Sequence, residues 1–166
     1  MKLPVVVAVI SDTHGLLRPE AVEALRGAKH IIHAGDIGGP EILEKLAAIA
    51  PVTAVRGNID KAPWTRNLPK TEVLEIGGAS IYVLHDLSIL DLNPKAAGFN
   101  VVVSGHSHIP KHETRDGILY FNPGSAGPRR FKLPVSVGKL IVEEGMVRGE
   151  LIRLPLAGSD LLSLHC

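Results

Sequence analysis

Two short motifs in this sequence place a pair of metal-ligating residues two positions apart. Asp12 and His14 form an Asp-x-His pair, and His106 and His108 form a His-x-His pair. In an extended segment, side chains two residues apart lie on the same face, so each pair could bind one cation. Each motif alone is common by chance, and its meaning depends on what accompanies it.

Further candidate ligands follow a series of short apolar segments. Five such segments, rich in Val, Ile, Leu and Ala, each end close to a residue that can bind a metal. The candidate ligands are Asp12, His14, Asp36, Asn58, His85, His106 and His108. Glycine precedes three of them, at Gly35, Gly57 and Gly105. Glycine allows a sharp turn and a close backbone approach at these points.

The ligand types favour a pair of catalytic cations. Imidazole, carboxylate and amide groups without a thiolate suit a catalytic site for Mn, Fe, Zn, Ni or Co better than a structural zinc site. Seven ligands exceed what one ion needs, whereas two ions that share one carboxylate account for them. Two ions roughly 4 Å apart can bind the attacking and the leaving oxygens of a phosphoryl displacement. The remaining histidines fit no such scheme: they are His30, His33, His112 and His165. We expect His33, inside a strand, to be a packed or surface histidine, with lining of the site as the alternative.

The elements that must position these groups begin as an alternating series. Strands are expected at residues 5–10, 30–34 and 52–55, and helices at 19–28 and 40–50. This order predicts parallel strands joined by right-handed crossovers. Ligands of open α/β sheets bind outside the carboxyl ends of the strands, so the candidates should converge on one crevice.

The second half of the chain changes to a hairpin pattern. A loop is expected at residues 58–69, a short irregular helix at 87–97 and a buried strand at 101–103. Turn signals at Gly77-Gly78, Asp116-Gly117 and Glu144-Gly145 predict three hairpins. Their strands are expected at residues 72–76 with 81–84, 111–115 with 118–121, and 135–143 with 146–154. This half should therefore be mostly antiparallel.

Composition narrows the class of protein. The 166 residues are 45% hydrophobic and 21% charged, as in an ordinary globular domain with a real core. Aromatic residues make up 4% and the net charge is +1, which argues against a partner that is long nucleic acid. One local basic cluster contains Arg129, Arg130 and Lys132, and either a solvated face or a phosphate contact explains it.

Neither a disulfide nor a membrane segment is expected. Cys166 is the single cysteine, so the chain cannot form an internal disulfide. The longest apolar run, at residues 5–10, is far too short to span a bilayer, and no signal-peptide cleavage pattern follows it. We therefore expect a cytoplasmic location and no membrane partner.

Together, the motifs resemble the calcineurin-like metallophosphoesterase superfamily. The similarity is greatest to its small bacterial and archaeal phosphodiesterase branch, which also includes the retromer scaffold subunit. The motif order is that of the family: Asp12-x-His14, Gly35-Asp36, Gly57-Asn58-x-Asp60, His85 and Gly105-His106-x-His108. Asn122-Pro123-Gly124-Ser125 also resembles a segment common in this branch. The resemblance covers residues 5–154, and the five motifs together are highly specific.

The resemblance implies a fold and an assembly. The expected fold class is α/β (α+β), a four-layer α-β-β-α sandwich with two mixed β-sheets face to face, flanked by helices. A single domain over residues 1–166 would have its core at 5–154, with residues 155–166 as a tail or short docking segment. Family members are often dimers or larger, so a homodimer or a homotetramer is among the assemblies implied.

The resemblance also implies a role for each ligand. Asp12, His14 and His108 would hold the first metal, and Asn58, His85 and His106 the second. Asp36 would bridge the two metals, and a hydroxide between them would attack phosphorus in line. Asp36 and Asn58 would thus take part in catalysis through the metals. Manganese is the first expectation, with nickel, iron, zinc, cobalt or magnesium as alternatives. The partner would be a small phosphate-ester substrate, with Asn122, Ser125 and Arg129 as candidate contacts.

Two residues depart from the family pattern. Many members have, in place of Ile59, a histidine that protonates the leaving group, a contribution of about 10²–10⁴-fold. Phosphodiesters with leaving groups that need no proton, such as aryl esters, are therefore the expected substrates. Asp60 would then bond to the backbone or to Asn58. Asp86 replaces a usual glycine and would either crowd the second metal or add a ligand. Ile59 also leaves an alternative function, a non-catalytic protein-binding scaffold that retains the fold.

Overall fold

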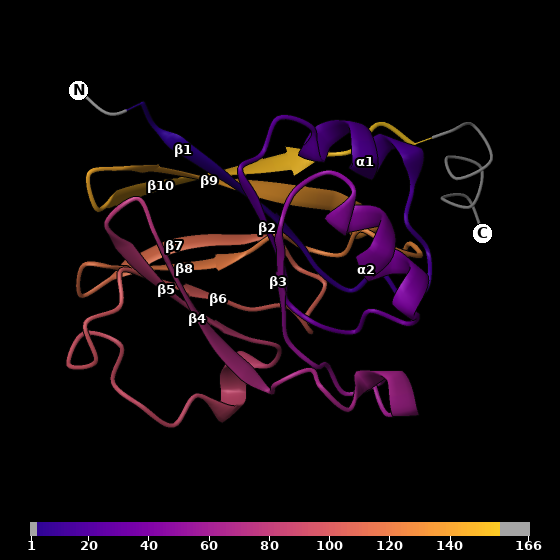
Figure 1. Cartoon of the computed structure of the whole chain (residues 1–166), viewed down its shortest axis with the longest axis horizontal. Helices are drawn as coiled ribbons and strands as arrows, with labels where there is room; N and C mark the ends of the chain where they lie inside the picture. Colours follow the sequence, from indigo (N-terminus) through magenta and orange to yellow (C-terminus); the bar gives the residue numbers. More distant parts are fainter. Residues whose placement is uncertain (1–2, 157–166) are drawn as a thin grey trace.

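Two five-stranded β-sheets pack face to face in the computed structural model, which describes residues 3–156 (Figure 1). The first sheet contains β1 (Val5–Ile10), β2 (His30–His33), β3 (Val52–Ala54), β9 (Ser136–Glu143) and β10 (Met146–Arg153). Its strand order is β10-β9-β1-β2-β3, with β1, β2 and β3 parallel and β9 antiparallel to β1. The sequence therefore predicted the alternating first half correctly, but the C-terminal hairpin completes the same sheet.

The second sheet is also mixed. It contains β4 (Thr71–Ile76), β5 (Ala79–Leu84), β6 (Val101–Val103), β7 (Lys111–Arg115) and β8 (Ile118–Asn122). The order is β4-β5-β6-β8-β7, in which β5, β6 and β8 are parallel. All three expected hairpins form. The parallel block was not visible in the sequence, because two crossovers without regular helices connect its strands.

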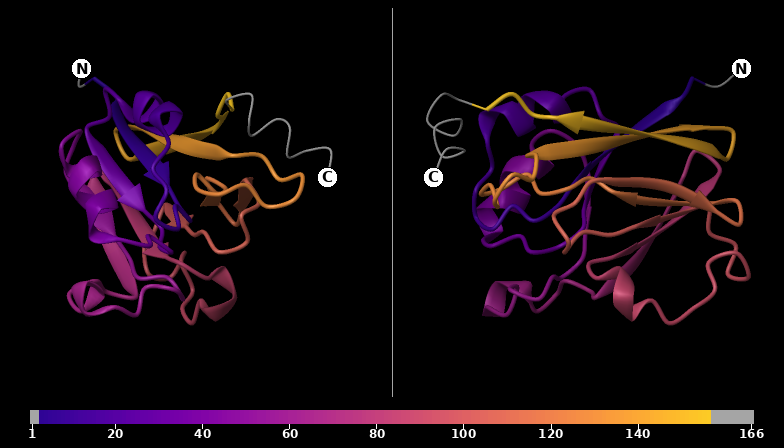
Figure 2. Two further views of the ribbon diagram at one scale, coloured as in Figure 1. Left: turned by 90° about the vertical axis from the view of Figure 1, so that its right-hand side faces the viewer. Right: turned by 180° about the vertical axis from the view of Figure 1, so that it is seen from behind.

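Helices cover the outer face of the first sheet. Figures 1 and 2 show α1 (Pro19–Leu25) and α2 (Pro40–Ala47) on the side away from the second sheet. Each helix has proline in its first turn, where the missing N–H breaks no helical hydrogen bond. Both helices end three residues before the expected boundary. Within the described residues, no helix is long and apolar enough to cross a membrane.

The outer layer on the second sheet is irregular. The helix expected at residues 87–97 is reduced to a single 3₁₀ turn, η2 (Leu87–Ile89), and another turn, η1 (Pro63–Thr65), lies in the expected loop. Leu87, Leu90, Leu92 and Phe99 nevertheless pack on this sheet, so the segment still serves as a covering layer. The expected α/β sandwich of two mixed sheets is thus confirmed. The tail expected at residues 155–166 lies, from residue 157 onward, outside the described residues.

Strand β1 shows how the layers share one core. Val7 and Val9 face the apolar cluster between the sheets, whereas Ala8 and Ile10 face the cluster beneath the helices. All four side chains are fully buried. A strand buried on both faces has a continuous apolar sequence, as this one does, rather than an alternating one.

The two sheets meet closely around one aromatic ring. Phe121 of β8 is buried and points at the first sheet, where Gly138 of β9 and Gly149 of β10 leave room for it. A Cβ atom at Gly138 would collide with the Phe121 ring, and one at Gly149 would lie 2.8 Å from ring atom Cε2. The spacing of the two sheets therefore depends on glycine at positions 138 and 149.

Gly138→Ala should reduce the free energy of unfolding by about 1–3 kcal/mol, because the added methyl group overpacks the core against Phe121. Urea denaturation of the purified protein measures this change. Lys139→Ala, one residue along the same strand, is the control and should have a smaller effect. Equal stabilities of Gly138→Ala and the wild type would show that the sheets separate without cost at this point.

Candidate metal centre

The carboxyl ends of both parallel blocks meet at one site. Residues after β1, β2, β3, β5 and β6 supply all seven predicted ligands. The structure brings most of them into two groups whose ligand atoms lie within 4.8 Å of one another. The first group is Asp12, His14 and His108, and the second is Asp36, His85 and His106. Parallel strands of two facing sheets thus deliver side chains to the same rim.

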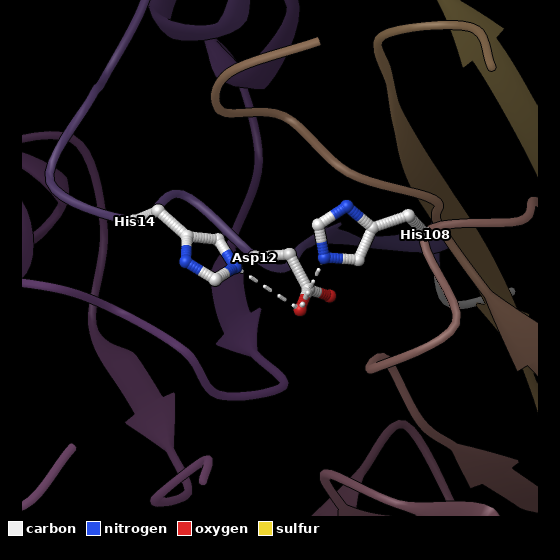
Figure 3. Close-up of side chains that lie close together, drawn as sticks. All are labelled: Asp12, His14 and His108. Atoms are coloured by element: carbon white, nitrogen blue, oxygen red, sulfur yellow. Dashed lines mark ion pairs between the residues drawn. The ribbon is translucent and has the colours of Figure 1, made fainter. Parts of the chain in front are cut away.

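The Asp12 carboxylate is at the centre of the first group. Its Oδ2 atom accepts hydrogen bonds from the Ser11 hydroxyl at 2.6 Å and from the His106 backbone N–H at 3.1 Å. Its Oδ1 atom lies 3.3 Å from His108 Nε2 and 3.7 Å from His14 Nε2. Figure 3 shows the two rings on either side of this carboxylate. One oxygen is therefore held by the protein while the other faces ring nitrogens.

Asp36 lies between the two groups. Its Oδ1 accepts a hydrogen bond from the Ile59 backbone N–H at 3.1 Å. Its Oδ2 lies 3.5 Å from His14 Nε2, in the first group, and 3.3 Å from His85 Nε2, in the second. Asp36 thus repeats the arrangement of Asp12, with one oxygen fixed and the other directed at imidazoles.

Hydrogen bonds fix which nitrogen of His85 faces the site. Its Nδ1 atom lies 2.8 Å from the Ala34 carbonyl oxygen and must be the donor, because a carbonyl only accepts. The Nε2 atom then carries a lone pair toward the site, as in metal-ligating histidines. Nε2 also lies 3.0 Å from the Asn58 amide and 3.3 Å from Nδ1 of His106. Asn58 therefore joins the second group, and its amide lies 3.1 Å from His106 Nδ1.

The backbone at these positions is unusual. Five of the seven predicted ligands have a positive φ, between 47° and 71°, a region that residues other than glycine rarely adopt. They are Asp12, His14, Asp36, His106 and His108. The preceding glycines make the crowding possible: a Cβ atom at Gly57 would collide with Asp36, and one at Gly35 would lie 2.7 Å from His85 Nδ1. Such strain is typical of functional sites.

The electrostatics keep both carboxylates charged. Burial alone would raise the pKa of Asp12, but the nearby His108 and His14 rings and the hydrogen bond from Ser11 hold the pKa far below its usual range. Burial likewise acts to raise the pKa of Asp36, and His85 and the Ile59 N–H outweigh it. The pKa of His85 rises, because Asp36 and the Ala34 carbonyl outweigh its burial. The site is thus a buried anionic centre ringed by imidazoles.

Two buried atoms in this centre are suited to binding a cation. Asp12 Oδ1 and His14 Nε2 are buried and have no hydrogen-bond partner within the described part of the chain, and the third such atom is His108 Nδ1, the ring nitrogen that does not face Asp12. Buried polar groups are normally satisfied, and an unpaired carboxylate oxygen is especially unfavourable. A divalent ion among Asp12, His14 and His108 would satisfy both atoms, so this set of residues is suited to metal binding.

The three predicted substrate contacts lie elsewhere in the network. The Asn122 side chain donates to the Gly105 carbonyl at 3.0 Å and accepts from the Gly124 N–H at 2.8 Å. The Ser125 hydroxyl donates to the Asp12 carbonyl at 3.1 Å. Both residues are buried and support the ligand loops. Arg129 donates to the Leu133 carbonyl and lines a different pocket. A contact between substrate and any of these three stays a prediction.

The structure shows the hydrogen-bond partners of Asp60 and Asp86, two residues discussed above with the departures from the family pattern. The Asp60 carboxylate accepts from the backbone N–H groups of Ile37, Gly38 and Gly57, which is the backbone alternative expected above. Asp86 Oδ1 accepts from the Ser88 N–H and hydroxyl, and its Oδ2 lies 3.9 Å from His106 Nε2. Asp86 therefore lies on the far side of the His106 ring from Asn58.

His33 has a positioning role that the sequence did not reveal. It is fully buried, its Nδ1 accepts the Gly35 N–H at 3.1 Å, and its Nε2 lies 3.0 Å from the Thr13 hydroxyl. Thr13 in turn donates to the Ile37 carbonyl at 2.7 Å. The chain of bonds links the loop of Asp12 and His14 to the loop of Asp36. The expectation of a packed histidine holds, and only long-range contacts show what it supports.

One family model and one solved structure show what this chain is similar to. Residues 5–145 match the sequence model of the calcineurin-like phosphoesterase superfamily domain. The structure superimposes on vacuolar protein sorting 29 from Cryptosporidium parvum with a TM-score of 0.73 at 20% identity, covering 90% of this chain and 97% of that one. At this identity the superposition concerns the fold alone.

Two curated relatives are closer in sequence. The chain is 40% identical over 151 residues to a protein of Methanocaldococcus jannaschii named "probable metallophosphoesterase", covering 83% of this chain and 76% of the relative. It is 31% identical over 160 residues to the phosphodiesterase YfcE of Escherichia coli, covering 78% of this chain and 84% of that protein.

Acid should destabilise the metal-free protein partly through His33. Burial lowers the pKa of His33 to about 4, whereas the unfolded chain binds a proton near pH 6.5. The unfolded state therefore takes up the proton first, and stability falls as the pH drops from 6.5 to 4, by up to about 3 kcal/mol.

Chemical denaturation of wild type and His33→Gln in the presence of a chelator, between pH 7 and 4, measures this effect. The variant should be less stable at pH 7 but should lose less stability on acidification. His112→Gln, at an exposed histidine of β7, is the control. Parallel pH profiles for wild type and His33→Gln would refute a neutral, hydrogen-bonded His33.

Proposed function

We propose, since this chain belongs to the calcineurin-like phosphoesterase superfamily, that it is a metal-dependent phosphodiesterase with a two-cation site. Its family and its relatives support a metal-dependent phosphoesterase. The two-cation site and the preference for diesters are the further steps that we propose, and each rests on particular side chains.

The position of Asp36 carries the two-cation proposal. A carboxylate oxygen that faces His14 of one group and His85 of the other is suited to bridging. Asp12, His14 and His108 would hold one ion, and Asn58, His85 and His106 the other. Manganese is our first choice and nickel, iron, zinc, cobalt and magnesium are alternatives, since this set of N and O donors does not select one metal.

The residues of the site supply orientation and charge. Divalent cations bound here would make water a better nucleophile and offset the negative charge that develops on the phosphoryl oxygens. The Ala34 carbonyl holds His85 with its Nε2 lone pair inward, and the Ser11 hydroxyl and His106 N–H hold Asp12. These bonds organise the ligands in advance, so that little rearrangement is needed on binding.

The side chain at position 59 supports the preference for diesters. Ile59 follows the predicted ligand Asn58, is 44% exposed and has no group that can protonate a leaving oxygen. Ester groups that leave without a proton, such as aryl oxides, avoid this deficiency. The relative YfcE, a protein named phosphodiesterase, is consistent with the same substrate class.

A protein-binding scaffold is the second candidate. The fold is similar to that of a vacuolar protein sorting protein, and Ile59 replaces a proton donor with an exposed apolar side chain. A scaffold, however, has no need for buried, strained ligands with unpaired Asp12 and His14 atoms. Background activity in a fully metal-loaded protein, together with a stable complex with another protein, would favour the scaffold.

Dialysis against manganese followed by metal analysis should find about two ions per chain, because two groups of ligands share Asp36. His108→Ala should reduce the content to about one ion, since it removes a ligand of the first group only. His112→Ala, outside the site, should retain both. Full occupancy in His108→Ala would contradict the assignment of that group.

Manganese-loaded protein should hydrolyse bis(p-nitrophenyl) phosphate, and Asp36→Asn should lower kcat by roughly 10²-fold or more, because the amide lacks the bridging charge. Asp116→Asn, the same exchange in the exposed turn between β7 and β8, is the matched control. Release of p-nitrophenolate is measured by absorbance. Unchanged activity of Asp36→Asn would refute the proposed mechanism.

A further inference from the structure

A pocket opens beside the second ligand group. It has a volume of about 480 Å³, and Asn58, His85 and His106 form one side of it. A substrate whose phosphorus lies at the metal centre would extend one of its ester groups into this space. The pocket therefore faces the part of a diester that the reaction centre itself does not bind.

Three cationic side chains line the same pocket: Arg56, Lys61 and Lys70. They come from different points of the chain and are held together through the backbone. The Arg56 N–H donates to the Pro69 carbonyl at 2.8 Å, which brings Arg56 next to Lys70. Asp60, which accepts three backbone N–H groups, fixes the loop that carries Lys61.

These three cationic side chains have no carboxylate partner among the described residues. Within residues 3–156 none of them forms an ion pair or a side-chain hydrogen bond, whereas Arg26, Lys111, Arg115 and Arg148 pair with glutamates. The two carboxylates of the pocket are occupied: Asp60 by backbone N–H groups, and Asp86 by Ser88. Both carboxylates keep their negative charge, so the three cations and two carboxylates of the lining sum to +1, and the three cationic side chains remain available to pair with an anion.

The pocket also has an apolar part. Ile89, at the end of the 3₁₀ turn after His85, is 63% exposed and lines it. Charged walls with one apolar surface suit an organic phosphate better than a free inorganic ion, because the carbon skeleton can cover the isoleucine while the phosphate meets the cations.

We infer that this pocket binds a second phosphate group of the substrate, so that the preferred substrates are phosphodiesters that carry a further terminal phosphate monoester. The inference rests on the proposed phosphodiesterase function and names its substrate class. A terminal phosphate carries close to two negative charges near pH 7, and three unpaired cations match it far better than a neutral ester group.

Two probes with the same leaving group test the inference. They are the p-nitrophenyl ester of thymidine 5′-phosphate and the same compound with an added 3′-phosphate. With manganese-loaded protein, kcat/KM should be on the order of 10-fold higher for the compound with the 3′-phosphate, mainly through KM. In Lys61→Ala/Lys70→Ala the ratio of the two kcat/KM values should approach one. Lys45→Ala, at an exposed position of α2, is the control and should keep the wild-type ratio.

A binding measurement in chelator separates this inference from the proposed function. By calorimetry, thymidine 3′,5′-bisphosphate should bind the metal-free protein several-fold more tightly than thymidine 5′-phosphate, and added salt should reduce the difference. Lys61→Ala/Lys70→Ala should abolish it. If neither ester is hydrolysed but this binding pattern is observed, the proposed phosphodiesterase function is rejected and the inference that the pocket binds a second phosphate is retained. If both esters are hydrolysed at equal kcat/KM and both nucleotides bind equally, the inference that the pocket binds a second phosphate is refuted, and the proposed phosphodiesterase function is retained.

Discussion

The buried carboxylate of Asp12 sets the central constraint on this molecule. One of its oxygens is satisfied by Ser11 and the backbone of His106, and the other faces His14 and His108 with no hydrogen bond. An anion at 0% exposure is unfavourable unless positive charge compensates it. The imidazoles can supply part of that charge and a bound divalent cation would supply the rest, so the surroundings of Asp12 are suited to a metal.

The backbone around this centre is arranged to serve it. Five ligands adopt left-handed conformations at the ends of strands, and the closely packed Gly35 and Gly57 let neighbouring loops approach. Strained residues persist only where the surrounding structure holds them, and here two rigid sheets do so. His33 and Asp60 connect the loops through backbone and hydroxyl groups. Local strain and long-range bonds therefore depend on one another at the residues that could bind a metal.

Chemistry and specificity occupy adjacent but different parts of the crevice. The ligand groups carry concentrated negative charge and imidazole, whereas Arg56, Lys61 and Lys70 bring positive charge to the neighbouring pocket. Ile59, whose backbone N–H hydrogen-bonds to Asp36, has a side chain that cannot donate a proton to a poor leaving group. The first part matches the motifs of the family, whereas Arg56, Lys61 and Lys70 are the side chains through which we infer that this chain selects its substrate.

The sequence by itself determined the strand ends and the residues placed there. Apolar segments, turn glycines and polar residues follow local rules, which is why β1 and the three hairpins were predicted nearly to the residue. Tertiary structure decided what depends on contacts distant in sequence. Such contacts decided the parallel pairing of β5, β6 and β8. They also decided the hydrogen bonds of Asn122 and Ser125 to the loops of the predicted ligands, and the role of His33. Arg56 follows β3 as Asp36 follows β2, so its position at a strand end was visible in the sequence. The sequence did not show that Arg56 lies in one pocket with Lys61 and Lys70, because only the fold brings their loops together.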